Sequence, residues 1–261
     1  MKNAILNHYG FSKLPFGKDI APDEVFHTNT LTQATAMLEL GLDSEDIMVL
    51  TGPIGCGKSL IIRHATHGFD SNQYQTIYLR GSLINPSELF KLILQGMKVD
   101  PPHSILKTKP IFFAAVAEAS LKPVVILDDA QDSSPEALLA IKTMTNFDSD
   151  SRNRITFILV GQPELTTILA YSHFDSLRAR IRLSHQLTGM TLEESCGFID
   201  HALSGVQRHE QLFSDAAKME IFKRTNGIAR HINTLCYQAI VNATISGKQI
   251  IDTLDLPQDP P

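Results

Sequence analysis

The stretch IMVLTGPIGCGKS, residues 47–59, decides the fold. It opens with a short apolar run, passes through a glycine-rich segment and leads into a helical pattern from Leu60, so the predicted order is strand, loop, helix. In that context Gly52, Gly57, Lys58 and Ser59 match the P-loop spacing G-x-x-x-x-G-K-S. Glycines in such a loop let backbone N–H groups surround phosphates, and the following helix N-terminus adds partial positive charge. The stretch therefore predicts a nucleotide site.

The residues expected to bind ATP run through the whole loop: Gly52, Pro53, Gly55, Cys56, Gly57, Lys58, Ser59 and Leu60. Lys58 is expected to meet the outer phosphates, and the Ser59 hydroxyl to ligate Mg²⁺. Cys56 stands at a variable position of the motif. It is interpreted as a small loop filler, the alternative being a redox switch whose thiol pKa Lys58 and the helix N-terminus lower.

Two acids follow an apolar strand in VVILDDAQ, residues 124–131. Asp128 is expected at the carboxyl end of that strand, where open α/β sheets bind their ligands. A carboxylate there is suited to hold the Mg²⁺ of a nucleotide, and Asp129 is the candidate for polarising the attacking water. The alternative is that both acids merely cap the next turn.

Gln162 and three arginines form the next candidates. Gln162 follows the apolar stretch ITFILVG, and it would lie beside the γ-phosphate if that strand neighbours the Asp128 strand; a turn-forming role is the alternative. In the segment SLRARIRL, alternation places Arg178, Arg180 and Arg182 on one side. Like charges on one face repel unless they meet anions, which favours a phosphate, such as the nucleotide of a neighbouring subunit, over a solvated basic strand.

Strand and helix patterns alternate through most of the chain. Further strands are expected at Gln75–Arg80, Pro123–Leu127 and Ile155–Val160, with helices that begin after the N-cap Asn85, at Pro110 and at Pro135. Such alternation requires a parallel sheet with right-handed crossovers. After Gly189 only helical patterns remain, at Leu192–Leu203, Ser214–Thr225 and Ala229–Ala243. A small helical domain is therefore expected to follow an α/β core.

Composition sets the outer limits. The chain has 261 residues, 43% hydrophobic and 20% charged, which excludes disorder, collagen-like repeats and a cysteine scaffold. A formal net charge of −5 neither requires nor excludes a DNA partner. The three cysteines show no metal-ligand spacing, which indicates a reducing, cytoplasmic setting without a structural metal. No apolar run approaches membrane-helix length, so no membrane partner is expected.

Six segments together resemble the ExeA-type branch of the AAA+ ATPases. They are YGFSKLPF (9–16), TGPIGCGKS (51–59), VVILDDAQ (124–131), ILVGQPEL (158–165), LRARIRL (177–183) and NGIARHINTLC (226–236). This branch groups the secretion ATPase ExeA (GspA) with transposition ATPases such as TniB and TnsC, and more distantly MuB and IstB. The resemblance implies an α/β fold, a P-loop AAA+ parallel-sheet core with a small C-terminal helical lid. The expected division is an N-terminal segment 1–46 that packs on the core, the core 47–188, the lid 189–254 and a tail 255–261, for which the prolines of DLPQDPP predict disorder.

The resemblance also assigns roles. Gln162 corresponds to the sensor 1 position, Arg180 to an arginine finger and Arg230 to the sensor 2 arginine, which adds Arg230 to the ATP-binding set. An arginine supplied by the next subunit makes the active unit a homo-oligomer, either a ring or a helical filament. Lysines 98, 107 and 109 surround the loop that lines the central pore in ring ATPases of this type, so Lys98, Lys107 and Lys109 are candidates for DNA contacts, a solvated loop being the alternative.

Two departures from the family pattern shape the functional expectation. The pattern reads D-E-A-[QH] where this chain has Asp129, one methylene shorter than glutamate, so we expect ATP hydrolysis to be slow. The chain stops at Pro261, where secretion members continue into a membrane span and a peptidoglycan-binding domain. The expected function is an ATP-dependent regulator of transposition that assembles on double-stranded DNA with a transposase and a target-selection protein. The alternatives are an ExeA-like ATPase for secretion-apparatus assembly and a nucleotide-gated scaffold.

Overall fold

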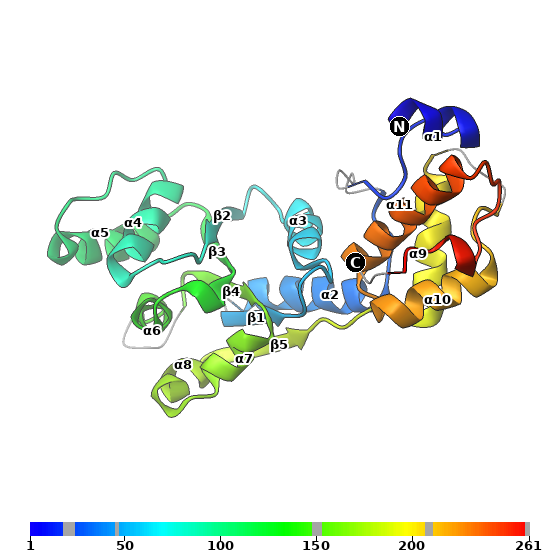
Figure 1. Ribbon diagram of the computed structural model, residues 1–261. Helices are drawn as coiled ribbons and strands as arrows, with labels where there is room; N and C mark the ends of the chain where they lie inside the picture. The colour runs from blue at the N-terminus through cyan, green and yellow to red at the C-terminus, as the bar shows by residue number, and fades with distance from the viewer. Residues whose placement is uncertain (18–23, 45–46, 148–152, 207–210, 259–261) are drawn as a thin grey trace. The chain divides into compact units, whose positions relative to one another are not determined.

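The computed structural model describes residues 1–17, 24–44, 47–147, 153–206 and 211–258 (Figure 1). The chain divides into two compact units. The sheet unit consists of Thr32–Ile54 and Lys58–Leu187, and the helical unit consists of Met1–Leu31, Gly55–Gly57 and Thr188–Pro261.

A five-stranded parallel sheet organises the sheet unit, in the order β2-β3-β4-β1-β5. The strands are β1 (Ile47–Thr51), β2 (Tyr74–Arg80), β3 (Lys122–Asp128), β4 (Thr156–Gly161) and β5 (Ile181–Gln186). The first four confirm the expected parallel α/β core. The fifth continues the arginine-rich segment and forms an edge of the sheet, where alternating half-buried and exposed residues are tolerated.

Helix α2 (Asn29–Asp43) precedes β1. The strands are connected by α3 (Lys58–Gly68), α4 (Pro86–Gly96), α5 (Ile105–Glu118), α6 (Pro135–Met144), α7 (Pro163–Leu169) and α8 (Asp175–Arg178), with 3₁₀ turns η2 (Ala130–Asp132) and η4 (Ser172–Phe174). As expected, the Asn85 side chain caps α4 in a reciprocal capping box with Glu88. The expected start of α5 at Pro110 was wrong, since the helix begins at Ile105 and contains that proline. Its buried stripe already starts at Thr108, so packing outweighs the usual rule that proline opens a helix.

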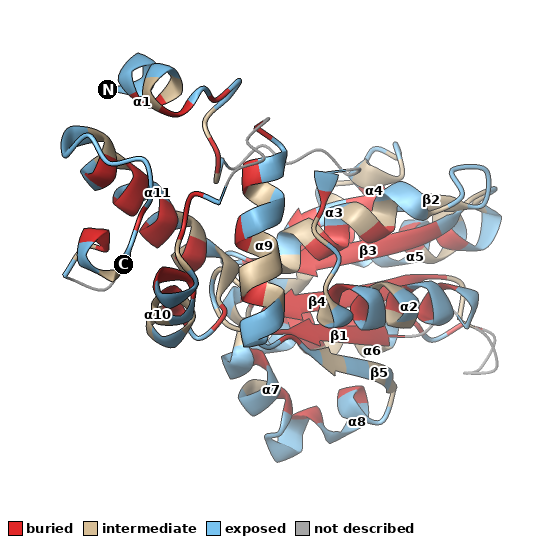
Figure 2. Ribbon diagram, turned by 90° about the vertical axis from the view of Figure 1, so that its right-hand side faces the viewer, coloured by how far each residue is buried: buried red, intermediate tan, exposed pale blue. Residues whose placement is uncertain are grey.

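The hydrophobic cluster of the sheet unit lies on one face of the sheet. Alternate residues of β1, such as Ile47 and Val49, face this cluster, and the intervening Met48 points to the opposite face. There α2 approaches so closely that a Cβ at Gly41 would come within 2.0 Å of the Met48 sulfur. Figure 2 shows β3 and β4 as buried for nearly their whole length, as expected for central parallel strands.

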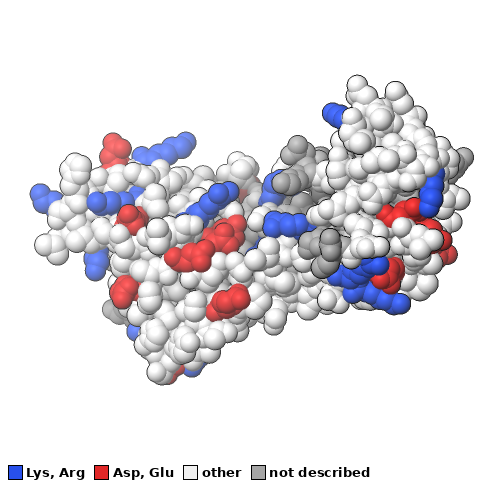
Figure 3. Space-filling view, viewed as in Figure 1, with Lys and Arg blue, Asp and Glu red and all other residues white. Residues whose placement is uncertain are grey.

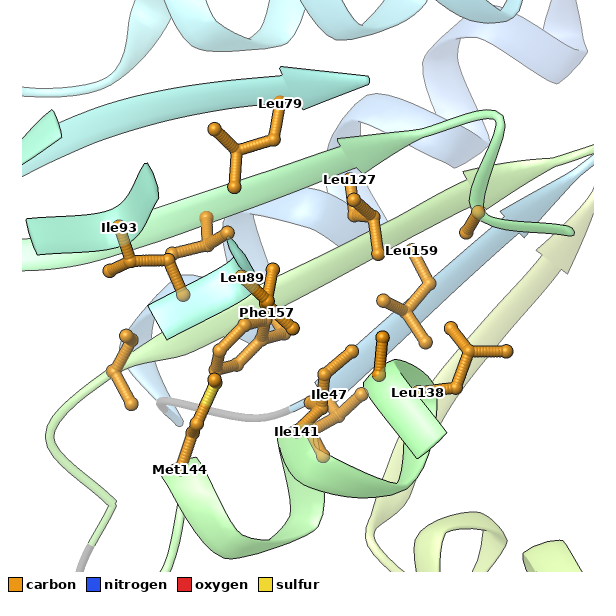
Figure 4. Close-up of a cluster of buried hydrophobic side chains, with 14 of the residues drawn as sticks. Ile47, Leu79, Leu89, Ile93, Leu127, Leu138, Ile141, Met144, Phe157 and Leu159 are labelled. Atoms are coloured by element: carbon orange, nitrogen blue, oxygen red, sulfur yellow. The ribbon is translucent and has the colours of Figure 1, made fainter. Parts of the chain in front are cut away.

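Phe157 of β4 is fully buried in the cluster that Figure 4 shows, together with Met144 of α6. We expect Phe157→Ala to lower the free energy of unfolding by about 3–5 kcal/mol, because the lost ring leaves a cavity that the parallel sheet cannot close. Urea unfolding of the full chain, followed by circular dichroism, measures this. Leu106→Ala, at a side chain 83% exposed, is the control and should stay within about 0.5 kcal/mol. Equal effects of the two substitutions would contradict this description of the core.

The helical unit contains α1 (Lys2–Tyr9), α9 (Leu192–Ser204), α10 (Asp215–Thr225), α11 (Ala229–Ile245) and the 3₁₀ turn η5 (Thr253–Asp255). The expectation that the whole segment 1–46 packs on the α/β core is corrected, since Met1–Leu31 belongs to the helical unit. The physical reason is apolar burial, because Ile5, Tyr9 and Phe11 join the core formed by the C-terminal helices. The Tyr9 hydroxyl also donates to the Lys248 carbonyl at 3.0 Å.

The start of the expected disordered tail 255–261 is folded instead. Asp255 ends η5 and its buried carboxylate pairs with the Lys248 ammonium. Leu256 is buried, and Arg224 Nη1 donates to the Pro257 carbonyl at 2.7 Å. A short apolar and charged patch therefore outweighs the breaking effect of the prolines, while residues 259–261 lie outside the described part of the chain.

Among the helices of the described ranges, none combines the length and the apolar character that crossing a membrane requires.

Candidate nucleotide-binding site

The P-loop lies at the carboxyl ends of the central strands. The Gly52 N–H donates to the Gly161 carbonyl at 3.2 Å, which ties the start of the loop to the end of β4. Lys58 Nζ donates to the carbonyls of Gly52 at 2.7 Å and Pro53 at 3.0 Å. The ammonium group is thereby held against the loop that is expected to surround the phosphates.

The tip of the loop requires glycine. Gly55 has a φ of 84° and Gly57 a φ of 103°, both in the left-handed region that disfavours side chains. Gly55 also accepts a hydrogen bond from the Arg230 N–H at 3.1 Å, and a Cβ on Gly55 would come within 2.6 Å of the Arg230 Cβ. Both residues belong to the helical unit, where Arg230 lies in the first turn of α11 with its side chain exposed. Its sensor 2 role stays a prediction.

Asp128 ends β3 with only 8% of the residue exposed. Its Oδ1 accepts the Asp129 N–H at 3.0 Å, and the Ser59 hydroxyl of α3 lies 3.4 Å from Oδ2. The Tyr78 hydroxyl of β2 also hydrogen-bonds to Oδ2. Three donors therefore converge on the Asp128 carboxylate. One of them is the Ser59 hydroxyl, which the sequence paired with Asp128 as a Mg²⁺ ligand.

Asp129 follows in the left-handed conformation, with φ 52° and ψ 43°. Gln131 connects it to the next strand: its Nε2 lies 3.4 Å from Asp129 Oδ1, and its Oε1 accepts the Gln162 N–H at 3.1 Å. A Cβ on Gly161 would come within 2.5 Å of Gln131 Oε1, so this connection needs glycine at the end of β4. Gln162 was expected beside the γ-phosphate only if its strand neighbours the Asp128 strand. That condition is met, because β4 pairs directly with β3.

The three arginines do not share one side of a strand, so that expectation was wrong. The chain forms the short helix α8 before β5 begins at Ile181, and this breaks the alternation. Arg178 Nη1 donates to the carbonyls of Leu169 and Ala170, each at 3.0 Å, and so caps the carboxyl end of α7. Arg180 Nη1 reaches Thr145 Oγ1 at 3.3 Å, and Arg182 is exposed on β5.

Arg180 lies at the amino end of the sheet. It precedes β5, whose first residue Ile181 pairs with Ile47 at the start of β1, whereas the P-loop follows Thr51 at the other end of β1. A strand of that length spans roughly 16 Å, which separates Arg180 from the P-loop of the same chain. Arg180 lines a surface pocket of about 740 Å³ together with Lys142 and Arg182.

The lysine candidates are all exposed but are not all in a loop. Lys98 lies just after α4 with a φ of 62°, whereas Lys107 and Lys109 belong to the first turns of α5. The expectation that all three surround a loop is corrected because α5 starts before Pro110. Lys109 Nζ lies 5.8 Å from the centre of the Phe90 ring.

Comparison with known families agrees with this geometry. Residues 42–169 match the family described as "AAA domain". This segment is similar to an AAA domain. Over 250 residues it is also 24% identical to general secretion pathway protein A of Aeromonas hydrophila, a match that covers 93% of this chain and 45% of that protein. The expected resemblance to ExeA-type AAA+ ATPases is thereby confirmed, and the resemblance to TniB and TnsC stays a prediction.

Solved structures share the fold at low sequence identity. Cdc6p from Pyrobaculum aerophilum has a TM-score of 0.73 and 17% identity, with 90% of this chain and 67% of that chain covered. The ORC2 protein of Aeropyrum pernix in its ADP form has a TM-score of 0.65 and 16% identity, covering 90% and 68%. The RuvB Holliday junction branch migration motor of Thermotoga maritima has a TM-score of 0.60 and 18% identity, covering 92% and 70%. These likenesses support the AAA+ fold alone.

The chemistry of this site fits ATP with Mg²⁺. Ser59 and Asp128 offer the oxygen ligands that Mg²⁺ prefers, and Lys58 supplies a positive charge for the phosphates. In the described part of the chain, no group of three or more His, Cys, Asp or Glu side chains is placed to hold a metal ion.

Sequence reasoning missed two residues of this site. Tyr78 reaches Asp128 from β2, and Gln131 joins Asp129 to Gln162. For Tyr78 the available signal was alternation, since Ile77 and Leu79 are apolar and place Tyr78 on the opposite face of the strand. That signal becomes informative only once β2 is known to pair with β3.

Proposed function

We propose that this chain is an ATP-dependent, DNA-binding AAA+ ATPase that assembles on double-stranded DNA and recruits or activates a transposase, with a target-selection protein as a further partner. The chain spans less than half the length of the curated relative that it matches, so partners are inferred here from the site and from chemistry. Hydrolysis of ATP by the AAA domain drives or times the assembly.

The position of Arg180 is the observation that carries the proposal. A strand length separates it from the P-loop of its own subunit, and it shares a pocket with two further cations, Lys142 and Arg182. An arginine that stabilises a phosphoryl-transfer transition state must reach the γ-phosphate. Arg180 therefore acts on the nucleotide of a neighbouring subunit, and the active form is a homo-oligomer, either a ring or a helical filament.

Exposed lysines support a DNA partner. Lys98, Lys107 and Lys109 belong to the α4–α5 part of the sheet unit, over which Figure 3 shows several Lys and Arg side chains. Contacts of this kind are made with phosphates and carry little sequence information. The RuvB protein that shares the fold is named as a motor for Holliday junctions, which are DNA. We therefore propose salt-sensitive binding with weak sequence preference.

Binding to a random-sequence duplex tests the proposal. Affinity is measured with ATP, ADP, a non-hydrolysable ATP analogue or no nucleotide, and the same samples are imaged by electron microscopy. We expect rings or filaments on DNA only in the ATP states. Combined replacement of Lys98, Lys107 and Lys109 by alanine should weaken binding uniformly across sequences and reduce the salt slope by about one per lost phosphate contact.

Lys223→Ala is the control, because this lysine is exposed on α10 in the other unit and should leave binding unchanged. An unaltered salt slope in the triple variant would contradict the role of the three lysines. Absence of DNA binding at low salt in every nucleotide state would contradict the transposition proposal itself.

A second candidate function is assistance to the assembly of a secretion apparatus, with a protein partner in place of DNA. The 24% identity to general secretion pathway protein A across 93% of this chain favours it. The DNA experiment separates the two candidates, since nucleotide-dependent oligomers that ignore DNA support the secretion function. A third candidate, a nucleotide-gated scaffold, rests on Asp129 and requires ATP binding with scarcely any hydrolysis.

A further inference from the structure

Tyr78 lies on the same face of the sheet as Asp128. In β2, Ile77 and Leu79 point into the apolar core, so Tyr78 points to the opposite face. In the paired strand β3, Asp128 is opposite Arg80, which places Tyr78 on the diagonal, two residues back. Diagonal neighbours lie within reach of an aromatic side chain. The Tyr78 hydroxyl donates a hydrogen bond across this diagonal to Asp128 Oδ2. The tyrosine is 47% exposed.

The two oxygens of Asp128 are held differently. Oδ1 accepts the Asp129 N–H at 3.0 Å, whereas Oδ2 meets the Tyr78 hydroxyl and lies 3.4 Å from the Ser59 hydroxyl. A carboxylate oxygen has two lone-pair directions. With Tyr78 on one of them, the other direction is directed toward Ser59, its expected partner in binding Mg²⁺. The two fixed hydrogen bonds prevent the carboxylate from rotating away.

The Tyr78 hydroxyl supplies the hydrogen of this bond, and such a donor is what an ionised carboxylate ligand requires from its neighbours.

We propose that Tyr78 is a positioning residue for Mg²⁺: its hydroxyl orients the Asp128 carboxylate so that Oδ2 and the Ser59 hydroxyl face the same ion. The inference rests on the proposed nucleotide site and goes beyond it by naming a group outside the P-loop and the acidic pair. Mg²⁺ demands near-ideal octahedral geometry, so a carboxylate that is free to rotate binds it less well. Hydrogen-bonding partners of metal ligands are typically worth about 10–100-fold in metal affinity.

Tyr78→Phe tests this, because it removes only the hydroxyl oxygen. The affinity of the full chain for ATP is measured by calorimetry in EDTA and across a Mg²⁺ titration. We expect the same ATP affinity in EDTA but a Mg²⁺ midpoint raised by about 10-fold or more. Bound Mn²⁺, observed by electron paramagnetic resonance as a substitute for Mg²⁺, should show an altered ligand geometry in the variant. A purely structural role would lower the affinity in EDTA and leave the Mg²⁺ midpoint unchanged.

Tyr74→Phe is the matched control, since Tyr74 lies on the same strand and its hydroxyl is 3.4 Å from Asp43 Oδ1, a carboxylate outside the site. It should leave the Mg²⁺ midpoint unchanged. A Tyr78→Phe midpoint equal to or below that of the unmodified chain would overturn the role of Tyr78 alone. An unmodified chain whose ATP affinity ignores Mg²⁺ would overturn both this inference and the metal site on which it rests.

Discussion

Arg180→Ala is expected to lower kcat for ATP hydrolysis by about 10³-fold or more while ATP affinity stays near that of the unmodified chain. The expected loss follows from the value of an arginine that stabilises the phosphoryl-transfer transition state. The unchanged affinity follows from position, since Arg180 lies at the amino end of the sheet and the P-loop of the same subunit at the carboxyl end. Steady-state hydrolysis and nucleotide calorimetry on the same preparation measure the two quantities.

A mixing experiment decides whether the arginine acts between subunits. Arg180→Ala subunits lack the finger, and Lys58→Ala subunits lack the P-loop cation, so each is expected to be inactive alone. Mixed oligomers contain interfaces at which an intact P-loop meets an intact Arg180, so activity should return. Arg182→Ala, in the same pocket, is the control and should lower kcat far less. Full activity of Arg180→Ala, or no recovery on mixing, would contradict the proposed oligomeric site.

The central fold was predictable because local signals agreed with one another. In β3 and β4 nearly every residue is apolar, and such strands are stable only when both faces are covered. The N-cap Asn85 and its partner Glu88 mark a helix start through hydrogen bonds between near neighbours in sequence. Such local signals predict a strand or a helix start without knowledge of how distant segments pack.

What the sequence could not provide is the arrangement of distant segments. The contact between Tyr78 and Asp128 depends on β2 pairing with β3 in one register, and a shift by one residue would turn the tyrosine to the other face. The N-terminal residues Ile5 and Tyr9 are buried with C-terminal helices. The sequence could not predict this packing, because an apolar side chain does not indicate which distant segment will cover it. The prediction that the three arginines share one side of a strand was wrong because it assumed an extended segment, whereas the chain forms α8 before β5 begins.

The acidic pair Asp128 and Asp129 combines a position that the sequence predicted with a contact that it did not predict. Asp128 lies where its motif and strand place it, at the carboxyl end of β3. The Gln131 amide is different, because its two hydrogen bonds join the end of β3 to the end of β4. Through it, the position of Asp129 depends on that of Gln162, which couples the candidate base to the candidate sensor. This coupling can be predicted only when the order of the strands is known, because the sequence motifs alone do not show that β3 and β4 are neighbours.

Asp129→Glu is expected to raise the rate of ATP hydrolysis about 10-fold, whereas Asp129→Asn should lower it by about 10²–10⁴-fold, the contribution of a positioned general base. The Asp129 carboxylate lies 3.4 Å from Gln131 Nε2, and the Asp129 backbone passes close to Gly81, where a Cβ would come within 2.4 Å of the Asp129 carbonyl oxygen. The extra methylene of glutamate extends the carboxylate by about 1.5 Å, toward the distance that proton transfer requires.

Single-turnover hydrolysis at saturating ATP measures the chemical step without product release. Asp132→Glu is the control, because this exposed acid ends the η2 turn that follows Asp129, and its rate should not change. An unaltered rate in Asp129→Glu would exclude side-chain length as the limit on turnover. A faster rate, with ATP affinity and DNA-bound oligomers unchanged, would mean that aspartate prolongs the ATP state and thereby the lifetime of the assembly that the ATP state maintains.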